Sequence, residues 1–235
     1  MAEAALLDHA RTALEAAQAY AAAVQAKLRT RLAHASLDAE QHAAHGYAWI
    51  ETSVAALRAV TSWLTRLEAD GQACAADELA VQIGLGETLA QLLGGLPMGQ
   101  NEFIRPADLD AQNAAQTLAD HVSVQYFLKR GNTAATRATL IQQLRDGQTI
   151  SDLTGDALID SIRDQYRRFT DDRILPFAHR WHLDNALIPD ATIGEMAALG
   201  TFGVCIPESY GGLGLGKLVD RKSTRLNSSH LVLSR

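Results

Sequence analysis

The sequence predicts an all-α protein, and three observations support that fold class. Apolar residues recur every three or four positions along most of residues 6–145, which is the period of an amphipathic helix. No part of that region alternates between apolar and polar residues as a half-buried strand would. The 235 residues are 47% hydrophobic and 20% charged, so the chain carries enough apolar surface to bury a core.

Two long helices are expected at the start of the chain. One apolar stripe spans residues 7–28, and a second spans residues 47–67. Asp38 is expected to cap the second helix, with Gln41 as its capping-box partner three residues later. Because the connection between the stripes is short, the two helices should pack as an antiparallel pair.

Glycine and proline delimit the elements that follow. Residues 75–93 have a helical pattern that we expect Gly84 and Gly86 to interrupt. Residues 94–105 are rich in turn formers and should be a loop. A proline at its first position then favours one further helix over residues 106–130.

The remaining elements read as shorter helices joined by a linker. Thr133 is expected to cap a helix that ends near residue 145, and residues 150–156 resemble a linker. The next helix should place Arg163 on its solvent face and should kink or stop at Pro176. Pro189 should begin one more helix before a glycine-dense, irregular stretch.

Composition excludes several classes of protein. A net charge of −6 argues against a nucleic-acid binder, and no apolar run approaches the roughly 18 residues of a membrane span. Acidic residues occupy the first positions, where a secretory signal would be basic. Cys74 and Cys205 are too few for a disulfide scaffold or a four-thiolate zinc site. We therefore expect a cytoplasmic protein without nucleic-acid or membrane partners.

Two patterns invite a ligand interpretation. Gly211, Gly212 and Gly214 match neither common phosphate-binding pattern, so a tight loop with positive φ angles is the better interpretation. His42 and His45 are one helical turn apart, a spacing that can chelate a metal. No third ligand or supporting partner is identifiable in the sequence, so we favour a solvated helix face and expect no metal.

Four further polar residues and one thiol were considered for chemistry. His179 and His182 flank a tryptophan, which favours packing or interface roles. Cys205 lies in an apolar run and is expected to be buried and inert. Glu208 and Tyr210 could be an acid and a phenol in a cleft, but no nucleophile pairs with them. We therefore assign no catalytic residue to this sequence.

Residues 164–216 resemble the opening of an acyl-CoA dehydrogenase. In that family two helices lead to a G-x-x-x-x-P-E-x-Y-G-G-x-G-L segment. The matching residues of this sequence are Gly203, Pro207, Glu208, Tyr210, Gly211, Gly212, Gly214 and Leu215. The resemblance implies a helical N-terminal domain, and it gives the glycines a role in backbone shape rather than in side-chain chemistry.

The resemblance also implies a domain order and an activity. Residues 1–150 would be an all-α extension, residues 151–219 a partial dehydrogenase N-terminal domain, and residues 220–235 a disordered, non-native tail. Such an extension is similar to that of one subgroup of the family. It implies FAD-dependent α,β-dehydrogenation of a branched dicarboxylic acyl-CoA, with an electron-transfer flavoprotein as acceptor and a homo-oligomeric assembly.

In this family a glutamate removes the α-proton while the flavin accepts a hydride. The family places that base and most FAD contacts in later domains, beyond Val219. No residue here is therefore assigned as the base or as a cofactor ligand, Glu208 included. The resemblance implies that this chain alone is inactive and binds no FAD.

The last sixteen residues differ in character from the rest. They carry four basic residues and one acidic residue, and the segment DRKSTRLNSSH resembles a translated sequencing adapter. The chain is accordingly expected to be a fragment whose natural sequence breaks off near Val219, although a natural basic tail is the simpler alternative. For the whole chain, the alternative function is a helical binding or assembly module fused to a vestigial dehydrogenase domain.

Overall fold

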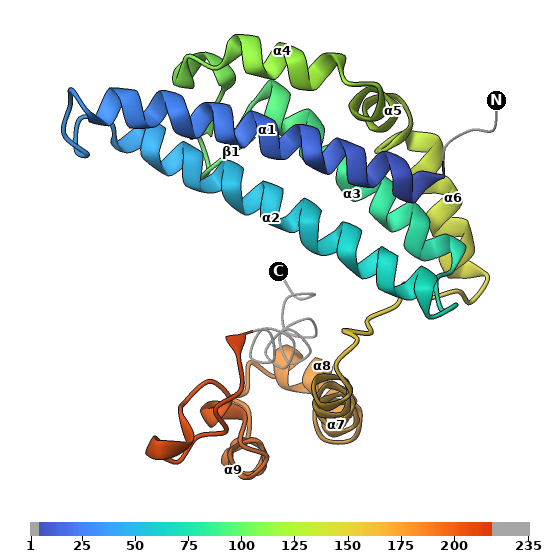
Figure 1. Ribbon diagram of the computed structural model, residues 1–235. Helices are drawn as coiled ribbons and strands as arrows, with labels where there is room; N and C mark the ends of the chain where they lie inside the picture. The colour runs from blue at the N-terminus through green and yellow to red at the C-terminus, as the bar shows by residue number, and fades with distance from the viewer. Residues whose placement is uncertain (1–4, 218–235) are drawn as a thin grey trace. The chain divides into compact units, whose positions relative to one another are not determined.

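The computed structural model describes residues 5–217 and divides the chain into two compact units, residues 1–152 and residues 153–235 (Figure 1). Each unit is treated by itself below. The expected non-native tail, residues 220–235, lies outside the described residues. Within them the fold is all-α apart from one pair of two-residue strands, which confirms the predicted fold class.

The first unit is a bundle of helices around α1, which is antiparallel to α2 (Figure 1). Helix α4 runs along the other side of α1, α5 contacts both α1 and α3, and α6 packs on α3. The helices are α1 (Leu6–Leu32), α2 (Gln41–Ala69), α3 (Ala75–Gly94), α4 (Gln112–Asp120), α5 (Val122–Arg130) and α6 (Ala134–Arg145). The prediction of an antiparallel pair at the start of the chain is therefore confirmed.

Small side chains allow the helices of the first unit to approach closely. The buried face of α1 includes four alanines at helical spacing, and each is at most 2% exposed: Ala10, Ala13, Ala17 and Ala21. The facing helices contribute larger fully buried side chains, namely Ile50, Leu64, Leu85, Leu89 and Phe127. One continuous apolar core results, and it extends through α1 to α5.

The start of α2 differs from the prediction. Helix α2 begins at Gln41 with Glu40 in the N-cap position, and Asp38 lies in the preceding turn. That turn forms because the amide of Ala39 donates to Ser36 Oγ at 3.2 Å. An ion pair of 2.5 Å between Arg31 and Glu40 then links the end of α1 to the start of α2. The predicted Asp38 cap was wrong because residues 37–40 form this extra turn, so that Glu40 and not Asp38 directly precedes the helix.

Helix α3 is continuous through both glycines, so the predicted interruption was wrong. Gly86 is buried where α3 meets the end of α5. A Cβ atom on Gly86 would lie 2.7 Å from the Cα of Gly131, closer than folded proteins allow. The space around Gly84 is open, with no neighbour within 4 Å among the described atoms. Gly86 thus permits close packing of two segments rather than breaking the helix.

Residues 94–130 form more elements than the single loop and single helix that were expected. Strands β1 (Leu96–Pro97) and β2 (Phe103–Ile104) pair antiparallel within the predicted loop. The predicted helix begins as a 3₁₀ turn over Pro106–Leu109 and then divides into α4 and α5. The division falls at His121, whose extended backbone ends α4 and whose ring accepts a hydrogen bond from the amide of Ser123 in the first turn of α5.

The second unit contains three helices and an irregular stretch among its described residues. These are α7 (Ala157–Arg173), α8 (Leu175–Leu183) and α9 (Asp190–Ala198), followed by 3₁₀ turns at Thr201–Gly203 and Glu208–Tyr210. Helix α7 ends just before Pro176, which lies in the first turn of α8, so the predicted stop is confirmed. Pro189 occupies the N-cap position of α9, which confirms the predicted start there. Thr133 and Asp156 likewise cap α6 and α7 through their side chains.

Arg163 does not lie on the solvent face of α7 as expected. It is 7% exposed, and its guanidinium binds Asp160 at 3.0 Å and Asp164 at 2.8 Å. The bond from Arg163 holds the pKa of the Asp164 carboxyl below its usual range. The prediction failed because a charged side chain can be buried when its partners are on the same helix turn.

Candidate functional site

The glycine-dense loop, residues 203–216, follows α9 in the second unit. Its two ends are held together by backbone hydrogen bonds that cross the loop. The carbonyl of Gly203 accepts from the amides of Ile206 at 3.1 Å and Leu213 at 2.9 Å. The carbonyl of Ile206 accepts from Gly214 at 2.8 Å, and that of Val204 accepts from Leu215 at 2.9 Å. These hydrogen bonds make the loop compact and hold its two ends next to each other.

Three glycines of this loop meet conformational or steric requirements. Gly211 and Gly214 have φ angles of 80° and 62°, in the left-handed region that favours glycine. A Cβ atom on Gly212 would lie 2.1 Å from the carbonyl oxygen of Ile206, so only glycine fits there. These angles agree with the interpretation of the segment as a tight loop.

The loop is attached to α7 and α9 by one small apolar cluster. Val204 is 1% exposed and packs against Tyr166 of α7, which is 3% exposed. The hydroxyl of Tyr166 donates to the carbonyl of Leu199 at 3.5 Å, at the end of α9. Beyond it, Gly200 adopts a φ of 78°, and a Cβ atom at this position would lie 2.8 Å from a methyl carbon of Leu213. The aromatic residue on α7 thus positions the loop.

The backbone amides of the loop are already used. The six consecutive amides of residues 210–215 all donate to carbonyls between Gly203 and Glu208. A phosphate cradle needs amides that point outward at the ligand. The described residues of this loop therefore do not fit the pyrophosphate of a flavin, and no cofactor contact is assigned to them.

The side chains of the loop lie in solvent. Tyr210 is 83% exposed, and Pro207 and Glu208 are exposed beside it. The side chains of Glu208 and Tyr210 are thus exposed on the surface and do not lie in a cleft. Cys205 is exposed as well, so the expectation that it is buried was wrong. Val204 takes the inward position of this run, which turns its neighbour outward.

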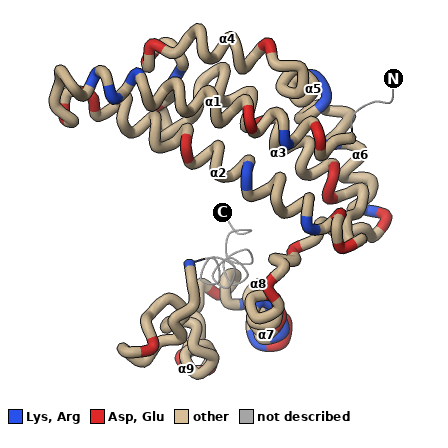
Figure 2. Tube along the Cα trace, viewed as in Figure 1, with Lys and Arg blue, Asp and Glu red and all other residues tan. Residues whose placement is uncertain are grey.

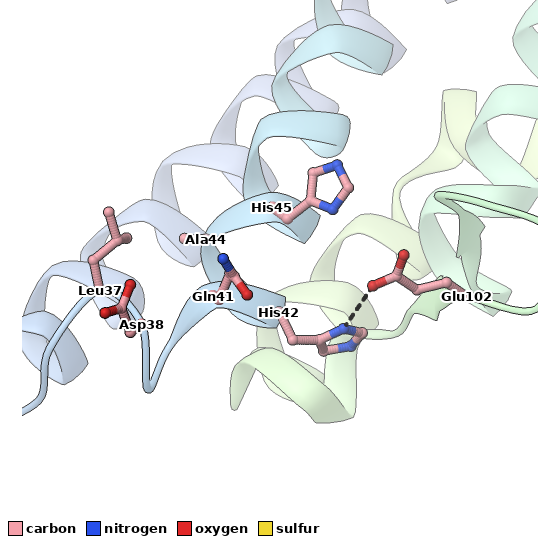
Figure 3. A pocket seen from close by; sticks show the side chains of 7 residues that line it. All are labelled: Leu37, Asp38, Gln41, His42, Ala44, His45 and Glu102. Carbon is pink, nitrogen blue, oxygen red and sulfur yellow. Dashed lines mark hydrogen bonds and ion pairs between the residues drawn. The ribbon is translucent and has the colours of Figure 1, made fainter.

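A second candidate is the pocket at the start of α2 in the first unit (Figure 3). It is lined by Leu37, Asp38, Gln41, His42, Ala44, His45 and Glu102. Glu102 comes from the turn between β1 and β2, and its Oε1 lies 3.4 Å from His42 Nδ1. The turn is held near α2 because Gly46 leaves room for Ile104, which is 2% exposed.

The histidines of this pocket are engaged with other groups. His45 Nε2 accepts a hydrogen bond of 2.9 Å from the indole of Trp49, so this lone pair is not directed into the pocket. Among residues 5–217, no group of three or more His, Cys, Asp or Glu side chains is arranged to hold a metal ion. The pocket therefore supplies no ligand set that could define a metal chemistry.

Two further histidines that the sequence analysis considered, His179 and His182, are exposed on α8. The aromatic contact there is made by Phe177 and Trp181, whose ring centroids are 5.9 Å apart. A packing or interface role for either histidine stays a prediction. In the described part of the chain, no helix has both the length and the hydrophobicity to cross a bilayer.

One residue with a central structural role was missed in the sequence. Asp77 is fully buried and binds two backbone amides, those of Cys74 and Ser151. The capping-box spacing of Cys74 and Asp77 could have indicated the first of these bonds. No local pattern could have indicated the second, because Ser151 is far away in the sequence.

Comparison with known proteins identifies relatives of both parts of the chain. Residues 159–221 match the family of acyl-CoA dehydrogenase N-terminal domains. The chain is 40% identical over 185 residues to (2S)-methylsuccinyl-CoA dehydrogenase of Cereibacter sphaeroides, covering 77% of this chain and 33% of that protein. It is also 37% identical over 54 residues to glutaryl-CoA dehydrogenase of Desulfococcus multivorans, covering 23% of this chain and 14% of that protein.

The extents of these similarities differ in an informative way. The second unit begins only at residue 153, so a similarity over 77% of the chain must extend well into the first unit. The similarity to glutaryl-CoA dehydrogenase is shorter than the second unit. The chain spans about a third of the length of its first relative and a smaller share of the second.

Proposed function

We propose that this chain, whose residues 159–221 match the acyl-CoA dehydrogenase N-terminal domain, is the N-terminal part of an enzyme of that family that oxidises (2S)-methylsuccinyl-CoA. The product would be mesaconyl-CoA, the α,β-unsaturated thioester. FAD would accept the hydride, and an electron-transfer flavoprotein would take the electrons onward. We further propose that the base and most FAD contacts lie outside the described residues, and we assign no chemical step to those residues.

One observation carries the choice of substrate. The similarity to (2S)-methylsuccinyl-CoA dehydrogenase includes much of the first unit, which a general acyl-CoA dehydrogenase N-terminal domain would not require. The helical bundle is thus shared with a dehydrogenase of named substrate. A binding module fused to a vestigial dehydrogenase domain fits this observation less well, because an enzyme carries the same two parts.

The test is an activity comparison on the protein encoded by the native locus, sequenced across the codon for Val219. We expect downstream dehydrogenase domains, and a purified product that oxidises (2S)-methylsuccinyl-CoA with an artificial electron acceptor. Glutaryl-CoA serves as the competing substrate, since its dehydrogenase is the second relative. A locus without those domains, or equal turnover of the two thioesters, would contradict the proposal.

The isolated 235-residue chain offers a separate test of how the activity is divided. We propose that it neither binds FAD nor oxidises acyl-CoA, because the loop amides at 210–215 are already bonded internally. After incubation with FAD and gel filtration, the chain should emerge without the visible absorbance of a flavin. A stoichiometric yellow complex would mean that residues outside this loop build a complete cofactor site.

A further inference from the structure

Helix α6 lies outside the apolar core of the first unit. The structure describes all twelve of its residues and none of them is buried, whereas each of the helices α1 to α5 has at least two buried residues. No residue of α6 belongs to the core cluster, and the helix contacts the rest of the unit mainly through α3. Burial of apolar side chains therefore stabilises α6 very little.

The face of α6 that packs on α3 is also more polar than expected for an amphipathic helix. Its half-buried side chains are Thr136, Leu140 and Gln143, whereas the larger apolar side chains Ile141 and Leu144 are exposed. The Oε1 atom of Gln143 is buried and has no hydrogen-bond partner among the described residues. A helix of twelve residues is only marginally stable in water by itself. The packing on α3 adds little to that stability.

The segment is nevertheless fastened at its start by polar contacts, which we call the first tie. The carbonyl of Arg130, at the end of α5, accepts from Gln82 Nε2 of α3 at 2.7 Å and from Thr136 Oγ1 of α6 at 2.9 Å. The side-chain amide of Asn132 donates to Glu87 Oε2 of α3 at 2.7 Å. These bonds join the first turn of α6 to both α5 and α3.

A second tie follows the end of α6. The amide of Ser151 donates to Asp77 Oδ1 at 2.7 Å, and Asp77 is 0% exposed in the first turn of α3. The thiol of Cys74 donates to the carbonyl of Thr149 at 3.6 Å. A bond from an amide to a buried carboxylate is a strong one. Because the first tie is near Glu87 and the second near Asp77, α6 lies antiparallel along α3 between them (Figure 1).

We propose that residues 132–151 form a strap across α3, whose helix α6 unfolds locally while both ties and the core stay intact. Opening of the strap uncovers the side of α3 between Asp77 and Glu87, so this surface is accessible only while α6 is unfolded. The cause is the combination of strong polar bonds at both ends with weak packing between them. The inference concerns contacts within the first unit, so it does not rest on the proposed reaction.

Hydrogen exchange of the 235-residue chain, resolved by residue with nuclear magnetic resonance, tests the strap. The amides of residues 138–144 should exchange about a hundredfold faster or more than those in the middle of α3. The amide of Ser151 should exchange more slowly than those of residues 138–144, although Ser151 lies outside any helix. Equal protection of α6 and α3 would overturn the proposal. Exchange of Ser151 together with α6 would also overturn it, because the second tie would then open with the helix.

A matched pair of variants tests whether the weak packing causes the opening. Gln143→Leu removes the unpaired buried oxygen and should slow exchange of residues 138–144 about fivefold or more. Gln142→Leu makes the same change at an exposed position, where the side chain binds only Asp146 within α6 and its cap, and should alter exchange by less than about twofold. Exchange in the middle of α3 should be the same in both. Equal effects of the two variants on α6 would overturn the proposal, because opening would not then depend on the face that packs on α3.

Discussion

The two units of this chain bury apolar surface to very different extents. The core of the first unit extends through five of its helices and includes side chains as large as Tyr20 and Phe127 at 2% exposure or less. The described core of the second unit centres on Tyr166 and Val204. Large apolar side chains of the second unit are exposed instead, among them Phe177, Leu183, Leu187, Phe202 and Tyr210.

This difference teaches how the two units hold their shape. The first unit is stabilised by burial, which is the main favourable contribution to folding. The second unit depends more on polar interactions for its stability, such as the Asp156 cap of α7 and the ion pairs of Arg163. Charged residues are also dense along α7, as the colours in Figure 2 show. We therefore expect substitutions in the first unit to have the larger effects on stability.

The largest effect is expected from truncating a core leucine. Leu89 is 0% exposed, whereas Leu187 in the second unit is 91% exposed. Leu89→Ala should destabilise the first unit by about 2–5 kcal/mol, the cost of a cavity in a packed core. Leu187→Ala should change stability by less than about 0.5 kcal/mol. Urea unfolding followed by circular dichroism measures both, and similar losses would contradict the comparison.

A pair of glycines in α3 gives the next effect and carries its own control. Gly86→Ala should destabilise by about 2 kcal/mol, because its methyl group would meet the backbone at Gly131. Gly84→Ala should stabilise by about 0.5–1 kcal/mol, since the position is helical with open space around it. Thermal unfolding midpoints that shift in the same direction would show that close packing of α3 does not matter.

The buried phenol of Tyr20 predicts a dependence on alkaline pH. Burial raises the pKa of Tyr20 to about 12, and its hydroxyl has no hydrogen-bond partner among the described residues. The unfolded chain ionises first as pH rises above 10, so the folded state should lose about 2–3 kcal/mol on approaching pH 12. This stability is fully present below pH 10.

Tyr20→Phe should reduce that alkaline loss and add about 1 kcal/mol at neutral pH, because it removes an unsatisfied buried group. Part of the alkaline loss should persist, since burial and a bond to Glu51 also raise the pKa of Tyr47 to about 12. Urea midpoints between pH 7 and pH 11 measure the difference. Identical pH profiles for variant and wild type would show that Tyr20 ionises freely in the folded state.

The smallest effect is expected from an exposed ion pair of the second unit. Arg173 of α7 binds Glu195 of α9 and lowers the pKa of that carboxyl. Its contribution is therefore present at neutral pH and lost as pH falls through the lowered pKa. Glu195→Gln should weaken the unit slightly at low salt and not at high salt, because exposed pairs are screened. A loss that persists in high salt would mean that the contact is more than electrostatic.

Much of the fold could be predicted because its signals are local. The stripes of α1 and α2, the Thr133 cap, the helix stop at Pro176 and the helix start at Pro189 each depend on residues close in sequence. The antiparallel pairing of α1 and α2 could be predicted from the short connection between them. The tight form of the glycine loop was also expected, since several adjacent glycines favour positive φ angles.

The errors share a different cause, which is contact between distant segments. Gly86 suggested a helix break, but it faces Gly131 of another element. Arg163 was predicted to lie in solvent and is buried, whereas Cys205 was predicted to be buried and is exposed. In each case the burial depends on which residue of the segment faces the interior. Burial of this kind depends on tertiary packing, so periodicity alone could not show it. The bond from Asp77 to Ser151 was invisible for the same reason.

Native-state hydrogen exchange of the intact chain tests the contrast between the two units most directly. The account predicts that amides in the middle of α1, α2 and α3 exchange only through global unfolding of the first unit. Amides in the middle of α7, α8 and α9 should exchange by at least about tenfold faster, through smaller openings. Equal protection in the two sets of helices would contradict the claim that burial stabilises the first unit more strongly than the second.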